Sequence, residues 1–350
     1  MTDKTVKRDI ASYDILKLIL SILILAINCL NLGLGKADFY IVEYVARLAV
    51  PLFFCMSGYF LFLNYNTDNH ERSKAHFKKY ELNLIKMFLI WNAVYLVIKI
   101  YEWYHDHTGL IDILKYFWYV CLGIQYQQLW YLGASIVGAF LVWVLLKKLS
   151  IKKILVISFL CYAVALVFFT YSTLTTPFIE KSRVMNFLFV NYNRFFSTFR
   201  NGVFFGFPFI AMGAYMAISP PKNQSVALNL PVFSAGMVLL LFETRYLSTI
   251  SAPYHGLMLF LLVVTPTAFI LVGKIKLKPS PAYRYIRKIS TYVFLDQFIP
   301  IFIFDEFISR NTEVNYLFRY LFCVVSSLVI AVIIVFAKEK ISGKKAALKN

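Results

Sequence analysis

The chain has 350 residues, of which 60% are hydrophobic and only 15% are charged, and its formal net charge is +18. Soluble domains average roughly 45–50% apolar and about 25% charged residues, so this composition excludes a soluble enzyme, a disordered chain and a secreted disulfide scaffold. A membrane-crossing helix takes about 20 apolar residues, and ten such helices would take up about 200, close to the apolar share of this chain. The composition therefore predicts an all-α, polytopic transmembrane bundle that forms a single domain over residues 1–350.

The apolar runs predict about ten membrane spans. They cover residues 11–33, 40–63, 82–101, 128–146, 153–171, 201–218, 228–248, 255–273, 289–309 and 316–337. Two connections are long. The 102–127 stretch has the pattern of a short amphipathic or re-entrant helix, and the 172–200 stretch is either a cover over an outward-facing site or a surface loop.

Basic residues alternate between the connections, with 23 Lys and Arg on one side of the predicted bundle and eight on the other. Because cytoplasmic loops carry the excess of Lys and Arg, both termini are predicted to be cytoplasmic. Topology then accounts for most of the positive charge, and we expect no nucleic-acid partner. The lipid bilayer is the expected surroundings, and the chain is predicted to be a multi-pass protein of a bacterial plasma membrane.

The five cysteines form no CxxC pair and lie within apolar sequence, which favours buried thiols over a disulfide framework or a zinc site. We therefore expect no bound metal. The first apolar run is too long for the apolar region of a cleavable signal peptide, so it is interpreted as the first span.

Polar residues in the first span follow one helical face. Asp14, Lys17, Ser21 and Asn28 are separated by 3, 4 and 7 residues. At 1.5 Å rise per residue, the stripe from Lys17 to Asn28 is about 16 Å long. It predicts a functional cavity that runs from the cytoplasmic surface towards the middle of the membrane; a helix-packing stripe is the alternative.

Other spans contribute isolated polar residues, which are costly inside a membrane and usually face protein or water. Arg47 lies near the start of the second span, where Pro51 predicts a kink and Gly58 a close helix approach. Glu243 lies towards the outer end of the seventh span. Asp296 in the ninth span is flanked by apolar residues, which is typical of an ion pair that locks helices together, here with Arg47 or Arg200; a proton-transfer role is the alternative.

Several motifs together resemble the integral-membrane acyltransferase-3 family. The first-span run "YDILKLILSILILAIN" and the second-span run "RLAVPLFFCMSGYFLF" are similar to its signatures. The segments "LWYLGASI", "RNGVFFGFPFIAMGAYMA" and "STYVFLDQFIP" then follow in the family order. The resemblance covers most of the chain, and it extends to single-domain O-acetyltransferases and to the membrane half of vancomycin-resistance serine racemases.

This resemblance implies a ten-helix bundle that transfers an acyl group, expected to be acetyl, from cytoplasmic acyl-CoA to a hydroxyl of a cell-envelope glycan or a lipid-linked sugar. Acyl-CoA is then a co-substrate, and no cofactor is bound. The family's first-span Arg, associated with acyl-CoA, corresponds to Lys17. The histidine associated with general-base work corresponds to Asn28, and two further family histidines correspond to Gln128 and Gln297.

An amide can keep a hydrogen bond but cannot accept a proton near neutral pH. We therefore take Asn28, Asp296 and His255 as the candidate catalytic residues, with Asp296 or His255 accepting the proton. The candidate substrate-binding residues are Asp14, Lys17, Arg47, Gln128, Trp130, Arg200, Glu243 and Gln297. The alternative function is a non-catalytic relative that binds or transports an envelope precursor, a sugar or an amino acid.

Overall fold

The computed structural model describes residues 11–65, 70–123, 127–196, 198–250, 256–309 and 314–347. Helices and their connecting turns make up these ranges, and no strand occurs in them. The all-α prediction is therefore confirmed for the described part of the chain.

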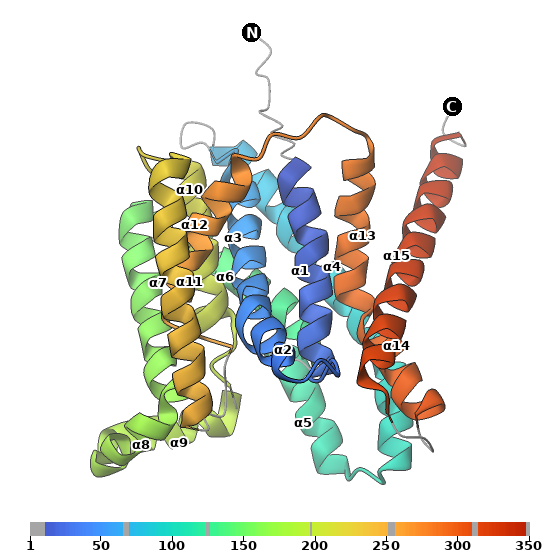
Figure 1. Ribbon diagram of the computed structural model, residues 1–350, viewed down its shortest axis with the longest axis horizontal. Helices are drawn as coiled ribbons and strands as arrows, with labels where there is room; N and C mark the ends of the chain where they lie inside the picture. The colour runs from blue at the N-terminus through green and yellow to red at the C-terminus, as the bar shows by residue number, and fades with distance from the viewer. Residues whose placement is uncertain are drawn as a thin grey trace. The chain divides into compact units, whose positions relative to one another are not determined.

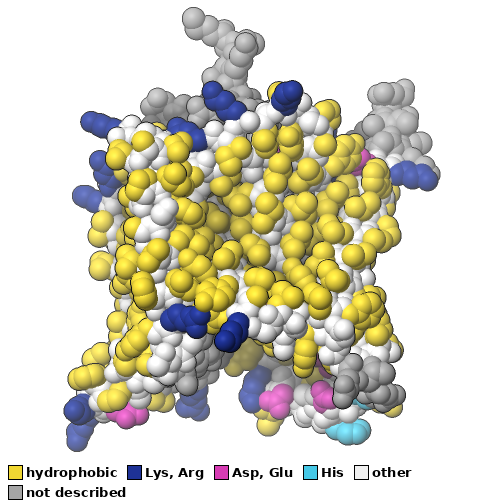
Figure 2. Space-filling view, in the orientation of Figure 1, with side chains coloured by type: hydrophobic (Ala, Val, Ile, Leu, Met, Phe, Trp, Pro, Cys, Tyr) yellow, Lys and Arg dark blue, Asp and Glu magenta, His cyan; other side chains and the backbone are white. Residues whose placement is uncertain are grey.

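Within the described ranges, six helices are long and apolar enough to cross a membrane. They cover Ala11–Cys29 (α1), Lys36–Phe62, Glu71–His105, Ile151–Thr170, Val226–Thr249 (α11) and Tyr316–Ile341. Shorter apolar helices cover Trp130–Leu145 (α6), Gly202–Ile218 and Leu261–Gly273 (α12). Apolar side chains cover most of the face shown in Figure 2, and most of the charged side chains lie near helix ends. The structure thus confirms a membrane protein.

Some of these segments change helix type along their length. Lys36–Phe62 consists of α2 (Lys36–Asp38), the π-helix η1 (Phe39–Tyr44), the 3₁₀ helix η2 (Val45–Leu48) and α3 (Ala49–Phe62). Ile151–Thr170 is α7 (Ile151–Ala165) followed by the π-helix η4 (Leu166–Thr170), and Gly202–Ile218 is the π-helix η5 (Gly202–Gly206) followed by α10 (Phe207–Ile218). The irregularity expected at Pro51 lies immediately before it, where 3₁₀ geometry gives way to α3.

The described residues form two compact units. One covers 51–269, and the other combines 11–50 with 270–347, from the two ends of the described chain. The second unit is built on α1, α13 (Ala282–Asp296) and α15 (Tyr316–Ala347) (Figure 1). Hydrogen bonds pair Ser21 with Ser290 and Asn28 with Gln297, so α1 and α13 run parallel. Lys288 pairs with Glu339, and Ser327 with Asp296, so α15 runs antiparallel to both.

The first unit packs α10 against α6 and α7, and α3 crosses α10 at very close range. A Cβ atom at Gly58 would lie 2.2 Å from the carbonyl oxygen of Ile210, and one at Gly213 would lie 2.0 Å from that of Cys55. The close approach predicted at Gly58 is confirmed, and it is reciprocal because each helix presents a glycine to the backbone of the other.

The connections are more helical than the sequence predicts. The 102–127 stretch contains α5 (Leu110–Cys121), which confirms the short helix expected there. The 172–200 stretch forms α8 (Ser172–Lys181) and α9 (Arg183–Phe196), so the surface-loop alternative is wrong, and a cover over an outward-facing site stays a prediction. The ninth predicted span is interrupted: α13 ends at Asp296, and α14 (Phe298–Ile303) and the π-helix η6 (Phe304–Ile308) follow. The helix α4 (His70–His105) begins well before its predicted span.

Candidate functional site

The polar stripe of α1 faces α13 at three levels. Asp14 forms a bidentate ion pair with Arg287, with Nε–Oδ1 and Nη2–Oδ2 distances of 2.7 and 2.8 Å. Ser21 donates to the Ser290 carbonyl oxygen at 2.8 Å, and Asn28 Nδ2 donates to Gln297 Oε1 at 3.0 Å. The shared face predicted for Asp14, Ser21 and Asn28 is therefore confirmed. The contacts are those of a packing stripe, because α13 supplies a partner at each level.

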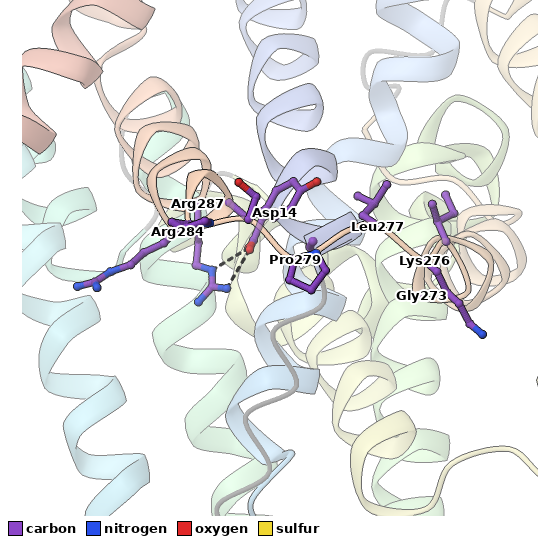
Figure 3. Close-up of a pocket in the computed structure, with 12 residues that line it drawn as sticks. Asp14, Gly273, Lys276, Leu277, Pro279, Arg284 and Arg287 are labelled. Carbon is purple, nitrogen blue, oxygen red and sulfur yellow. Dashed lines mark hydrogen bonds and ion pairs between the residues drawn. The ribbon is translucent and has the colours of Figure 1, made fainter.

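A pocket of about 1120 Å³ lies at the Asp14 end of this stripe, between the start of α1, the end of α12 and the start of α13. Its charged lining consists of Asp14, Lys276, Arg284 and Arg287 (Figure 3). Arg284 and Lys276 are exposed, whereas the Asp14 side chain is 4% exposed and neutralised by Arg287. This geometry leaves a net positive pocket of a size suited to a large anionic molecule.

The amide pair lies deeper in the same unit. Gln297 is fully buried, and its Nε2 donates to the Phe294 carbonyl oxygen at 2.7 Å while its Oε1 accepts from Asn28. Two of the three positions at which the resemblance expects histidines are thus in direct contact. The adjacent Asp296 turns to α15, where its Oδ1 contacts the Ser327 hydroxyl.

Lys17 is half-buried on α1, one turn after Asp14. Arg47 forms an ion pair with Glu43 at 2.5 Å within the irregular segment before α3. The ion pair between Asp296 and Arg47, considered from sequence, does not form: Asp296 pairs with no described cation of its own unit.

In the first unit, Trp130 and Arg200 lie together. The Arg200 guanidinium lies 5.5 Å from the centre of the Trp130 ring, and that ring stacks on Phe205 at 5.7 Å. Gln128 is buried and donates to the Tyr95 hydroxyl at 2.8 Å. These three predicted substrate-binding residues therefore share one unit, and their contacts give them defined positions. Their role in substrate binding stays a prediction.

Asn201 explains why the sequence following Arg200 begins a helix. Its Oδ1 accepts from the amides of Val203 and Phe204 at 3.0 and 3.2 Å, which satisfies free amides at the start of η5. Its Nδ2 donates to the Tyr192 hydroxyl at 2.6 Å. Burial raises the pKa of Tyr192 to about 12, so this hydroxyl stays neutral and donates in turn to Thr198 O.

Glu243 holds the segment before α12 in place through its carboxylate. Its carboxylate accepts from the Tyr171 hydroxyl and from the amides of Leu259 at 2.6 Å and Phe260 at 3.1 Å. These bonds fix the irregular segment that leads into α12, where buried amides need acceptors. His255 lies outside the described residues, so its predicted role stays a prediction.

Sequence reasoning missed three residues that complete these contacts: Arg287, Ser327 and Tyr95. Arg287 belongs to a basic loop, and membrane topology alone accounts for the positive charge of that loop. Ser327 is a small polar residue in the tenth predicted span, and Tyr95 is one of 24 tyrosines. A helical-face pattern on α13 of the kind used for α1 would have been the available signal for Arg287.

Comparison with known proteins gives one family. The acyltransferase domain model matches residues 10–336. The serine/alanine racemase of Enterococcus gallinarum is 28% identical over 336 residues, which are 93% of this chain and 46% of the relative. An amino-acid racemase of Enterococcus faecalis is 32% identical over 217 residues, 60% of this chain and 28% of that protein.

The chain thus spans less than half the length of these curated relatives. No solved structure matches it. The family match covers nearly the whole chain, in agreement with the order of its motifs and with its apolar helices. The chain belongs to the acyltransferase domain family.

Proposed function

We propose that the chain is a membrane acyltransferase that takes an acyl group, expected to be acetyl, from cytoplasmic acyl-CoA and passes it to a hydroxyl of an envelope glycan or lipid-linked sugar. The observation that carries this proposal is the basic pocket at the Asp14–Arg287 end of the second unit. Family membership supports the reaction class.

The charge distribution supports a cytoplasmic position for this pocket. The 274–288 connection carries six Lys and Arg and supplies most of the pocket's lining. Connections so rich in basic residues are retained in the cytoplasm, which is where acyl-CoA is available. We therefore assign both termini to the cytoplasm within a ten-span bundle.

The pocket chemistry suits the phosphates of CoA. Arg284 presents a planar guanidinium that can bind phosphate oxygens in pairs, and Lys276 supplies a mobile point charge. Arg287 already forms an ion pair with Asp14, so its main role is to neutralise that carboxylate beside the anionic ligand. Lys17 follows on the same α1 face towards the bundle interior.

The α1–α13 interface leads from the pocket to the amide pair, about 21 Å along the α1 axis at 1.5 Å per residue from Asp14 to Asn28. Asn28 and Gln297 can orient a hydroxyl acceptor through hydrogen bonds, but neither can take its proton. Asp296 and His255 are the candidates for the proton transfer, as the sequence predicts. Trp130 and Arg200 stay predicted substrate-binding residues of the first unit.

Binding of acetyl-CoA tests the pocket. Replacing Lys276 and Arg284 together by alanine should weaken binding at least about 100-fold, because a hydrogen bond to a charged group contributes about 1.5–3 kcal/mol. The matched control is Lys152→Ala with Lys153→Ala, which removes the same charge from an exposed stretch outside the pocket. Calorimetry on the purified full chain measures both. Equal affinities in the two double variants would show that acetyl-CoA binds elsewhere.

A second candidate function is binding or transport of an amino acid, sugar or envelope precursor without acyl transfer. The Asn28–Gln297 hydrogen bond favours it, because both amides stand where the family resemblance expects histidines. Two relatives are racemases, one of them named for serine and alanine, which makes an amino acid the first ligand to test.

The variant Asn28→His with Lys17→Arg separates the two functions. If the wild-type chain is an acyltransferase, membranes that contain it should transfer labelled acetyl from acetyl-CoA to an acceptor without either substitution. A restored general base should then raise the rate of acetyl transfer by a factor of about 10²–10⁴. Transfer by the restored variant alone, with none by wild type, would contradict acyl transfer by the native chain and favour the second function. Asn28→Ala with Lys17→Arg is the control for a non-specific effect of opening the Asn28–Gln297 contact.

A further inference from the structure

Pro300 interrupts the helical hydrogen bonding beside Asp296. α13 ends at Asp296, Gln297 keeps right-handed helical backbone angles (φ −52°, ψ −25°), and α14 begins at Phe298 two residues before Pro300. Because proline has no amide hydrogen, the carbonyl oxygen of Asp296 loses its usual helical partner. Neighbouring groups have to satisfy a backbone acceptor that is freed in an apolar segment, which directs attention to the groups around Asp296.

Asp296 is buried without a charged partner. It is 0% exposed, and its Oδ2 is buried and makes no hydrogen bond to any described residue. Its Oδ1 contacts Ser327 on α15. An ionised carboxylate in such a place costs several kcal/mol unless a positive charge or several hydrogen bonds compensate it.

Charged and titratable groups on the packed elements lie far along their helices or already have partners. On α1 they are Tyr13, Asp14, Lys17 and Cys29, and on α13 they are Tyr283, Arg284, Tyr285, Arg287, Lys288 and Tyr292. On η6 they are Asp305 and Glu306, and on the described side chains of α15 they are Tyr316, Arg319, Tyr320, Cys323, Lys338, Glu339 and Lys340. Arg319 is eight residues from Ser327, about 12 Å along the helix, and is held by Asp305 at 2.5 Å. Lys338 is eleven residues from Ser327, about 16 Å, and bonds to Tyr292.

The hydrogen bonds around Asp296 fit the protonated acid. The Ser327 hydroxyl contacts two oxygens, Asp296 Oδ1 and the Val293 carbonyl at 3.3 Å. If Asp296 is protonated, its O–H donates to Ser327, whose hydroxyl donates to Val293. If Asp296 is ionised, the single Ser327 hydrogen is the one side-chain donor that the described residues offer it, and its Oδ2 receives none.

We propose that Asp296 and Ser327 form a proton-binding site inside the second unit, in which Asp296 is a neutral carboxylic acid at neutral pH. The site adjoins the Asn28–Gln297 pair through the peptide link from Asp296 to Gln297. Asp296 therefore starts as a proton donor. It accepts the proton of a hydroxyl only after its own O–H bond has broken and its proton has moved to a leaving group. The protonation itself does not depend on the acyl-transfer proposal.

Infrared difference spectroscopy on the purified full chain tests the site. The wild-type protein at neutral pH should show the carbonyl stretch of a protonated carboxylic acid, displaced on exchange into heavy water. Asp296→Asn should lose the intensity of one acid per chain. The matched control is Asp305→Asn, which removes a carboxylate that is ion-paired with Arg319 and should leave the band unchanged.

Ser327→Ala provides a second measurement if Asp296→Asn does not fold. Losing the hydroxyl removes the acceptor of the acid O–H, so the band should stay but shift to higher frequency. A wild-type spectrum without the band, or a band unaffected by both variants, would show that Asp296 is ionised and overturn the site. Unfolding temperatures in sodium and in choline salts give a further check. If sodium raises the unfolding temperature of wild type and not of Asp296→Asn, Asp296 is ionised and binds a sodium ion in place of the proton, which also overturns the site.

Discussion

Arg287→Ala is expected to destabilise the protein by about 3 kcal/mol. The substitution leaves the Asp14 carboxylate, whose side chain is 4% exposed, without its bidentate partner. Removing one member of a buried ion pair costs about 3–5 kcal/mol, and the 43% exposure of the Arg287 side chain places the effect at the lower end. Thermal unfolding of the purified chain in one fixed detergent measures the loss.

Arg284→Ala is the control for this experiment. Arg284 lines the same pocket but is exposed, so its loss should change stability by less than about 0.5 kcal/mol. Removing both charges with Asp14→Asn and Arg287→Ala should recover much of the lost stability, because no uncompensated charge remains. Equal stability of Arg287→Ala and Arg284→Ala would mean that the ion pair does not hold α1 to α13.

The glycine contact between α3 and α10 should be equally sensitive. Gly58→Ala or Gly213→Ala places a methyl group within 2.2 or 2.0 Å of a backbone oxygen on the other helix. The obstacle is backbone, so the helices must separate, and each substitution is expected to cost about 3 kcal/mol, the upper end for overpacking. Unfolding temperature and the yield of monodisperse protein report the effect.

Gly109→Ala is the matched control, since a Cβ at Gly109 meets nothing within 4 Å and its φ is −70°. It should be neutral or slightly stabilising, because alanine loses less conformational entropy on folding. The double variant at Gly58 and Gly213 should cost less than the sum of the single variants, because one separation of the helices relieves both clashes. Unchanged stability in both single variants would contradict the close crossing of α3 and α10.

Hydrophobic pattern predicted the all-α fold and the approximate position of each apolar segment, because about 20 consecutive apolar residues leave few alternatives. It also placed Asp14, Ser21 and Asn28 on one face of α1. It did not predict that α13 would fill that face, since helical periodicity describes one element and carries no information about its partner. The helices α8 and α9 were missed because their sequence is rich in Asn, Thr and aromatic residues, and α8 includes Pro177.

The candidate site divides in the same way. Gln297 could be matched to Asn28 only through the family motif, because their separation of 269 residues has no local signature. The end of α13 at Asp296 was also not predicted, although Pro300 follows it closely. Arg287 was counted as topological charge, and only the bidentate geometry with Asp14 identifies it as a structural partner.

The pairing of α1 with α13 has a consequence for biosynthesis. The three polar levels of α1 find their partners 269–273 residues later in the chain. At roughly 5–20 residues per second of translation, α1 must wait about 15–50 s in the bilayer before α13 is made. During that interval Asp14 and Asn28 need water, lipid headgroups or a chaperone as temporary partners, whereas Ser21 can donate to the Lys17 carbonyl oxygen within α1. The second unit can therefore close only after the first has been synthesised.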